Sequence, residues 1–89
     1  MWNITIQFIK TDKELFLENV TSAQIISPYC GIEPHTITDF KSFRAYRGFV
    51  YDFYLESGII RTINGEDILF LHCEYRPFVE NLIQPTHGV

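Results

Sequence analysis

Residues 43–56, with the sequence FRAYRGFVYDFYLE, carry the clearest structural signal in this chain. Apart from Arg47, every odd position from Phe43 to Leu55 is apolar, whereas the even positions are mostly polar or aromatic. Because successive side chains of a strand point to opposite faces, this pattern predicts that the odd positions form a core. The stretch is too long for one flat strand, and Gly48 near its middle predicts a bend there.

Turn signals after this stretch predict two further strands. Glu56-Ser57-Gly58 supplies a tight hairpin, and residues 59–63 form the strand that follows it. Asn64-Gly65 predicts a type I′ hairpin, because both central residues of that turn need a positive φ. Residues 68–74 carry apolar side chains on both faces, which is typical of a central strand. Residues 43–74 are therefore predicted to form a three-stranded antiparallel meander.

Two strands are predicted before residues 43–56. Residues 2–8 alternate apolar and polar side chains, which indicates a strand with one buried face. A polar hairpin loop at Thr11-Asp12-Lys13 leads to a strand over residues 15–20, and residues 23–26 continue the same strand past a bulge. Ser27-Pro28 ends that strand, because proline cannot donate to a ladder.

The remaining segments give weaker signals. Residues 28–35 form a proline-rich loop, and residues 36–42 fit a short capped helix and an extended segment equally well. Residues 76–83 are predicted to make one or two helical turns. The expected fold is mainly β: a single domain over residues 1–89, built as a small antiparallel five-stranded curled sheet or partly open barrel with a short C-terminal helical segment.

Length and composition limit the class of protein. The chain has 89 residues, 46% of them hydrophobic and 16% aromatic, with a formal net charge of −4. This length allows one domain, and this apolar content is typical of a globular protein. No apolar run approaches the roughly 20 residues of a membrane-spanning helix, and the N-terminus lacks the pattern of a secretory signal. We expect a cytoplasmic protein that does not enter membranes, with Cys30 and Cys73 as free thiols.

Cys30 and His35 are the first candidates for chemistry. They could form an activated thiol, or a zinc site together with either His72 or Cys73. The last two are neighbours in a strand and point to opposite faces, so only three ligands are available for one ion. We expect His72 to be a half-buried structural side chain. No phosphate-binding, hydrolase or metalloprotease motif is present, and we predict no enzyme activity, no metal and no cofactor.

The even face of residues 43–56 is the candidate partner-binding surface. Its Arg44, Tyr46, Asp52 and Tyr54 lie opposite the predicted core, and tyrosine and arginine are enriched at interface hot spots. The alternative is that the two tyrosines cover neighbouring elements of the fold. This face predicts a module that binds another protein, with a homodimer as a further option. Small acidic proteins are common among phage and mobile-element inhibitors of host defence, so a stoichiometric inhibitor of that kind is the specific expectation.

Two other functions stay open. Lys41, Arg44 and Arg47 lie close to aromatic residues and could bind single-stranded nucleic acid, as small barrels do. The excess of acidic residues argues against this, because nucleic-acid binders usually present a basic patch. A domain that binds a small ligand is the second alternative.

Overall fold

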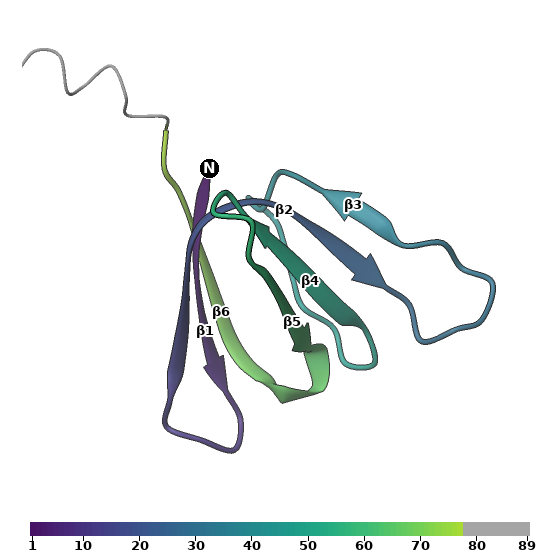
Figure 1. Cartoon of the computed structure of the whole chain (residues 1–89). Coiled ribbons are helices and arrows are strands. Elements are labelled where there is room, and N and C mark those ends of the chain that lie inside the picture. Colours follow the sequence, from purple (N-terminus) through teal and green to yellow (C-terminus); the bar gives the residue numbers. More distant parts are fainter. Residues whose placement is uncertain (78–89) are drawn as a thin grey trace, which may run out of the picture.

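The computed structural model describes residues 1–77 and shows one antiparallel sheet of six strands. The strand order is β5-β4-β2-β1-β6, and β3 pairs with β2 off this path (Figure 1). The sheet is not closed into a barrel, because β5 and β6 at its two ends do not pair with each other. In chain order the elements are β1 (Trp2–Phe8), β2 (Glu14–Ile26), β3 (His35–Ile37), β4 (Val50–Leu55), β5 (Ile60–Asn64), the 3-10 turn η1 (Gly65–Asp67) and β6 (Ile68–Tyr75).

The long strand β2 joins the two halves of the sheet. Its first half pairs with β1, and its second half pairs with β4 on one side and β3 on the other. The predicted bulge lies between these halves, where the pairing with β4 shifts register between Val20 and Ser22, and Asn19 just before it has a left-handed φ of 58°. The Asn19 amide donates to the Asn3 side-chain oxygen at 3.0 Å, and its carbonyl accepts from the Glu56 amide at 2.9 Å. The bulge therefore lets one strand serve two differently directed parts of the sheet.

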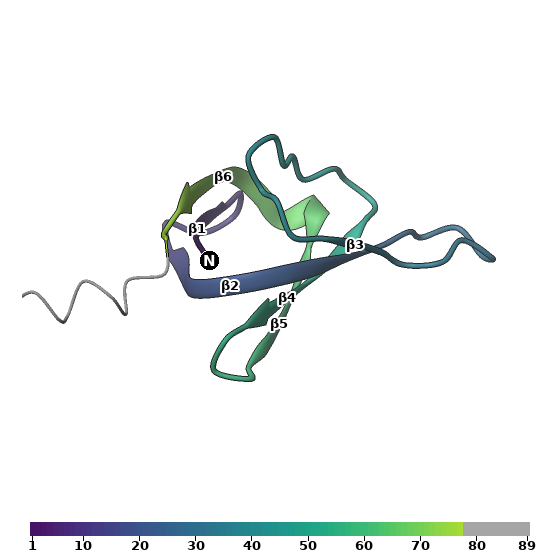
Figure 2. The same cartoon turned by 90° about the horizontal axis from the view of Figure 1, so that it is seen from above.

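The sheet is curled, as Figure 2 shows from above, and the buried side chains of the core lie on its inner side. The predicted inner face of β1 is confirmed, since Ile4 and Ile6 are fully buried. The odd positions of β4 are confirmed in the same way, with Tyr51 and Phe53 fully buried. The buried apolar residues are Ile4, Ile6, Leu17, Val20, Ala23, Phe40, Tyr51, Phe53 and Ile63.

The predicted long strand over residues 43–55 is wrong in its first half. Residues 38–49 form a loop, here called loop 38–49, and the strand β4 begins only at Val50. A turn separates the two parts: the Phe49 amide donates to the Tyr46 carbonyl at 3.4 Å, and Gly48 has a φ of 88°. The prediction for the faces still holds, because Phe43 packs on the core while Tyr46 is exposed. An extended segment alternates its side chains whether or not another strand pairs with it.

The predicted three-stranded meander is also wrong. The hairpin between β4 and β5 is confirmed, with the Leu55 amide donating to the Ile59 carbonyl at 2.9 Å. No hairpin follows at Asn64-Gly65, because η1 redirects the chain and β6 pairs with β1 instead. The Asn64 side chain caps η1 by accepting from the Glu66 amide at 3.2 Å.

A glycine is required at position 65 because another backbone segment lies against it, and not because its φ is positive. Its φ is not in the left-handed region, but a Cβ at this position would collide with the carbonyl oxygen of Tyr46. The Gly65 amide also donates to the Phe49 carbonyl at 2.8 Å. The residue therefore fastens loop 38–49 to the end of β5.

The prediction that residues 68–74 form a central strand is wrong as well, because β6 lies at an edge of the sheet. A register shift between Gln7 and Phe8 disturbs the alternation of β6. Leu69 falls at this shift and is 62% exposed. Phe70 and His72 lie on the outer face of the sheet, so Phe70 is 56% exposed and His72 is exposed where we expected it to be half-buried.

The two ambiguous segments have different outcomes. Within residues 36–42, Thr36 and Ile37 belong to the short strand β3, which is the sixth strand where five were expected, and the rest is loop. The predicted helical segment over residues 76–83 falls mostly outside the described residues, and its first two residues are not helical. Among residues 1–77, no helix is long and apolar enough to cross a membrane.

A candidate binding surface around loop 38–49

Loop 38–49 is held against the core at three points. The Phe40 ring is buried, and the Phe43 ring lies edge-on to Tyr51 with centroids 5.4 Å apart. The Tyr46 amide donates to the Tyr51 hydroxyl at 2.6 Å. Burial of this hydroxyl raises the pKa of Tyr51 above its ordinary value, so it stays a neutral phenol. The outward side chains between these points are therefore presented on a well-anchored backbone.

Two clefts flank the outward part of this loop. The first, here called the β6 cleft, has a volume of about 480 Å³ and lies between residues 41–45 of the loop and residues 69–71 of β6. The second, the β3 cleft, has a volume of about 390 Å³ and lies between the loop and strands β2 and β3. Residues 41–44 line both clefts, so this short segment forms a ridge between them.

The β3 cleft combines apolar and cationic groups. Ile25, Ile37 and Phe43 contribute apolar side chains, all of them partly buried against the core. Its other lining residues are polar or charged: His35, Asp39, Lys41, Ser42, Arg44 and Tyr46. A site of this composition suits an apolar group with a negative charge next to it.

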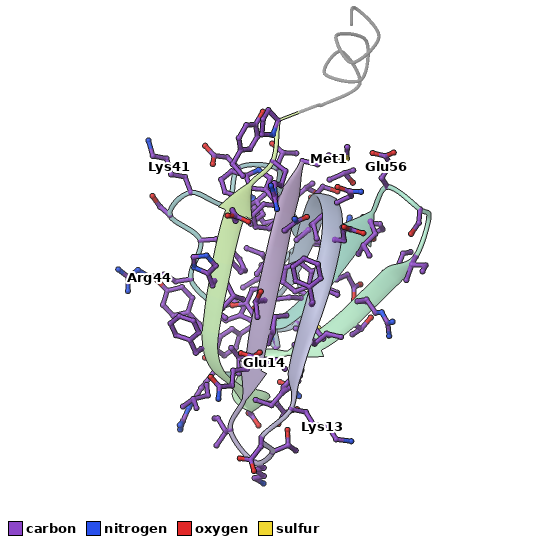
Figure 3. The ribbon with its side chains drawn as sticks, turned by 90° about the vertical axis from the view of Figure 1, so that its left-hand side faces the viewer. Met1, Lys13, Glu14, Lys41, Arg44 and Glu56 are labelled. Atoms are coloured by element: carbon purple, nitrogen blue, oxygen red, sulfur yellow. The ribbon has the colours of Figure 1, made fainter. Side chains whose placement is uncertain are left out.

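Lys41 and Arg44 are free cations in an acidic molecule. Both lie on the side of β6 that faces away from β1 (Figure 3). The single ion pair within residues 1–77 joins Arg76 to Glu74 at 3.5 Å, so neither Lys41 nor Arg44 is neutralised by a carboxylate there. The carboxylate of Asp39 is close in sequence, but it accepts a hydrogen bond from the backbone amide of Lys41 at 2.9 Å and forms no ion pair with the Lys41 ammonium group. The ridge is therefore positively charged although the chain carries a net charge of −4.

The structure divides the four predicted partner-binding residues between two surfaces. Arg44 and Tyr46 lie together on the exposed side of loop 38–49. Asp52 and Tyr54 lie on the outer face of the sheet and are only partly exposed. The Asp52 carboxylate accepts from the Thr62 hydroxyl at 2.6 Å, and the Tyr54 hydroxyl donates to the Gln24 side-chain oxygen at 3.2 Å. For Tyr54, the alternative of packing on a neighbouring strand is thus what the structure shows.

Sequence reasoning missed three members of the loop surface. Leu69 and Phe70 were assigned to a buried strand, because an edge strand with two apolar faces has the same local pattern as a central one. Lys41 was noticed only as part of a weak basic cluster. Nothing in the local sequence indicates that residues 41–45 and 69–71 lie side by side.

A second exposed apolar group lies at the tip of the hairpin between β2 and β3. This hairpin projects away from the rest of the sheet (Figures 1 and 2). Tyr29 and Ile32 are exposed at its tip, where Gly31 has a φ of 84°. The hairpin tip is therefore a suitable control surface when substitutions in loop 38–49 are tested.

The predicted chemistry of the cysteines has no assembled site within the described residues. Cys30 lies exposed in the hairpin tip and Cys73 lies half-buried in β6, and both are free thiols as expected. No three histidine, cysteine, aspartate or glutamate side chains of residues 1–77 form a group that could hold a metal ion. Cys30, His35 and either His72 or Cys73 are therefore not brought together as ligands.

The two thiols are expected to differ in reactivity. Burial raises the pKa of the Cys73 thiol to about 11, so only about one thiol in a thousand is ionised at pH 8. Because the thiolate is the reactive form, we expect iodoacetamide at pH 8 to label Cys30 more than about tenfold faster than Cys73. Peptide mass spectrometry over time measures both rates, with labelling in denaturant as the control for equal intrinsic reactivity. Equal rates in the folded protein would contradict the buried position of Cys73.

No known protein family, curated protein or solved structure matches this chain, so the geometry around loop 38–49 is what points to a function.

Proposed function

We propose that this chain is a protein-binding module that docks one-to-one on its partner through loop 38–49, without turnover. The observation that carries the proposal is the ridge of residues 41–44, with unpaired cations on it and a cleft on each side. A cleft wall that contains exposed apolar side chains, bordered by charges, is typical of surfaces that mark protein contact sites.

The side chains of this surface suit the centre of an interface. Tyr46 is 60% exposed, yet its backbone amide is fixed on the Tyr51 hydroxyl. Phe70 is exposed beside the β6 cleft, on the side opposite Arg44. Large aromatic side chains on an ordered backbone lose little conformational entropy on binding, which is why they are frequent hot spots.

The size and charge of the chain support a more specific version of the same proposal. A chain of 89 residues with a net charge of −4 fits a stoichiometric inhibitor of a host defence protein, carried by a phage or another mobile element. Such an inhibitor acts in the cytoplasm by occupying its target. The discriminating observations are a stable one-to-one complex with a single host protein and the loss of that protein's activity.

Substitutions in loop 38–49 test the proposal. Tyr46→Ala is expected to weaken binding of the partner captured by the wild-type chain by about thirtyfold, which is about 2 kcal/mol. Arg44→Ala is expected to weaken it by about tenfold, with a smaller effect at high salt because an ion pair at the rim is screened. Isothermal titration calorimetry on the purified partner measures both effects and the stoichiometry.

Tyr29→Ala is the matched control, because Tyr29 is a 70% exposed tyrosine on the projecting hairpin and not on loop 38–49. Its affinity should equal that of the wild type. If Tyr29→Ala weakens binding and Tyr46→Ala does not, the contact surface is the hairpin tip. If only Asp52→Ala and Tyr54→Phe weaken it, the partner covers the outer sheet face.

Binding measurements on the same purified chain distinguish the alternative functions. Binding of single-stranded nucleic acid through Lys41, Arg44 and Arg47 would weaken steeply with salt and would need no protein partner. Binding of a small ligand would produce saturable heat with a metabolite extract from which protein has been removed. Either result in place of a protein complex would overturn the proposal.

A further inference from the structure

The outer edge of β6 presents backbone groups without a partner strand. At the end of the β1–β6 ladder, the Arg76 amide donates to the Met1 carbonyl at 2.6 Å and the Met1 amino group donates to the Arg76 carbonyl at 2.9 Å. Hydrogen-bonded pairs alternate along an antiparallel ladder, so the amides and carbonyls of Leu71, Cys73 and Tyr75 point away from β1. No strand of residues 1–77 pairs with β6 on that side.

This unpaired edge adjoins the β6 cleft. Residues 69–71 of β6 form one wall of the cleft, and residues 41–45 form the other. Lys41 and Arg44 thus lie across the cleft from the edge, on the side of β6 that faces away from β1 in Figure 3. A segment lying along the edge would have hydrogen-bonding groups on one side and two cations on the other.

The first half of β2 has another unpaired edge, but its side chains protect it. Glu14 and Glu18 are exposed along this part of the strand, which pairs with β1 on one side only. Charged side chains on an edge strand discourage pairing, and two carboxylates would repel an acidic segment in particular. Beside the β6 edge, the charged side chains across the cleft are instead the cations Lys41 and Arg44 of loop 38–49.

We propose that the β6 cleft binds an extended, acidic segment of the partner protein, which adds to the sheet as a strand on β6. This inference rests on the proposed function and names the chemistry of the partner. Main-chain hydrogen bonds to Leu71 and Cys73 hold the segment, and its carboxylates lie opposite Lys41 and Arg44. Strand addition of this kind is an established mode of peptide recognition, in which the edge gives affinity and the flanking side chains give specificity.

Hydrogen exchange on the full chain tests this directly. In the free protein, the amides of Leu71 and Cys73 are expected to exchange faster than those of His72 and Glu74, which face β1. The probes are two synthetic peptides with acetylated and amidated ends, TVDVDVT and its basic counterpart TVKVKVT. The acidic peptide is expected to bind about tenfold more tightly than the basic one and to slow exchange at Leu71 and Cys73. Equal binding of the two peptides, or binding without this protection, would overturn the proposal.

Charge reversal provides the second test. The double variant Lys41→Glu and Arg44→Glu is expected to lose the preference for the acidic peptide by about tenfold or more. The matched control is Lys10→Glu with Lys13→Glu, which makes the same change of charge in the exposed loop between β1 and β2 and should keep the preference. A loss in both variants would show that the net charge of the chain, and not the cleft, selects the peptide.

The outcomes separate this inference from the proposed function. If the peptides leave the β6 amides unprotected while Tyr46→Ala still weakens binding of the partner, the chain is a binding module that does not use strand addition. If the free chain is a dimer by light scattering and Leu71 and Cys73 are already protected, a second copy occupies the edge. Both results overturn the inference, and neither one overturns the proposed function.

Discussion

Replacing Phe53 with alanine is expected to lower the free energy of unfolding by about 3–5 kcal/mol. The side chain is fully buried in β4, at 0% exposure. Its ring centroid lies 6.2 to 6.4 Å from those of Phe40, Phe43 and Tyr51. Removing it leaves a cavity under loop 38–49 as well as losing the burial of the ring. Small domains have only about 5–15 kcal/mol of stability, so this single change consumes a large part of it.

Urea unfolding followed by tryptophan fluorescence measures this loss, since the single tryptophan, Trp2, packs against Phe40 with ring centroids 5.8 Å apart. Phe16→Ala is the control of equal size, because Phe16 is 56% exposed in β2. It should cost less than about 1 kcal/mol. A loss below about 1 kcal/mol for Phe53→Ala would mean that the inner face of the sheet is not the core.

Gly65→Ala is expected to cost about 3 kcal/mol, although its backbone is not in the left-handed region. The added methyl group would overlap the Tyr46 carbonyl oxygen and lie 2.9 Å from the Phe49 carbonyl oxygen. Both atoms belong to backbone that is already held by hydrogen bonds, so neither can move cheaply. The loop must shift as a whole, and the partner-binding surface is expected to shift with it.

Gly58→Ala is the control for Gly65→Ala, because it introduces backbone strain without a steric overlap. Gly58 has a φ of 95°, but a Cβ there would meet nothing within 4 Å. Its substitution is expected to cost about 1 kcal/mol through backbone strain alone. Unfolding curves of the two variants give the comparison. If Gly65→Ala costs no more than Gly58→Ala, loop 38–49 is not fastened at Gly65.

Local patterns predicted the strands correctly where the partner of each strand is close in sequence. The alternation in β1 placed Ile4 and Ile6 in the core, and Thr21-Ser22 between two apolar runs indicated the bulged strand β2. Turn residues likewise predicted the β4–β5 hairpin. These features depend on side-chain periodicity and turn chemistry, which neighbouring residues determine.

Long-range pairing could not be predicted in the same way. Asn64-Gly65 has the composition of a hairpin turn, but its conformation is decided by the approach of Tyr46 and Phe49 from another segment. The apolar residues at both faces of β6 fit a central strand and an exposed edge strand equally well. The periodicity of a strand shows which of its faces are buried only when the neighbouring strands and covering segments are known.

The same distinction applies to the candidate site. The exposure of Arg44 and Tyr46 followed from the alternation of residues 43–46 and is confirmed by the structure. The assignment of Asp52 and Tyr54 to the same surface failed, because the turn at Gly48 separates the loop from β4. Phe70 lies next to loop 38–49 only because β6 pairs with β1, and this long-range pairing cannot be read from the local sequence.

The pairing of β1 with β6 also determines when this protein can fold. One edge of the first strand stays open until residue 75 has been synthesised, because its partner is the last strand of the described chain. Contacts between distant parts of a sequence slow folding, since the chain must lose loop entropy before they form. A ribosome-bound chain that stops before β6 therefore leaves the backbone groups of this β1 edge unpaired, and the cell must keep that nascent strand from pairing with others until β6 has been synthesised.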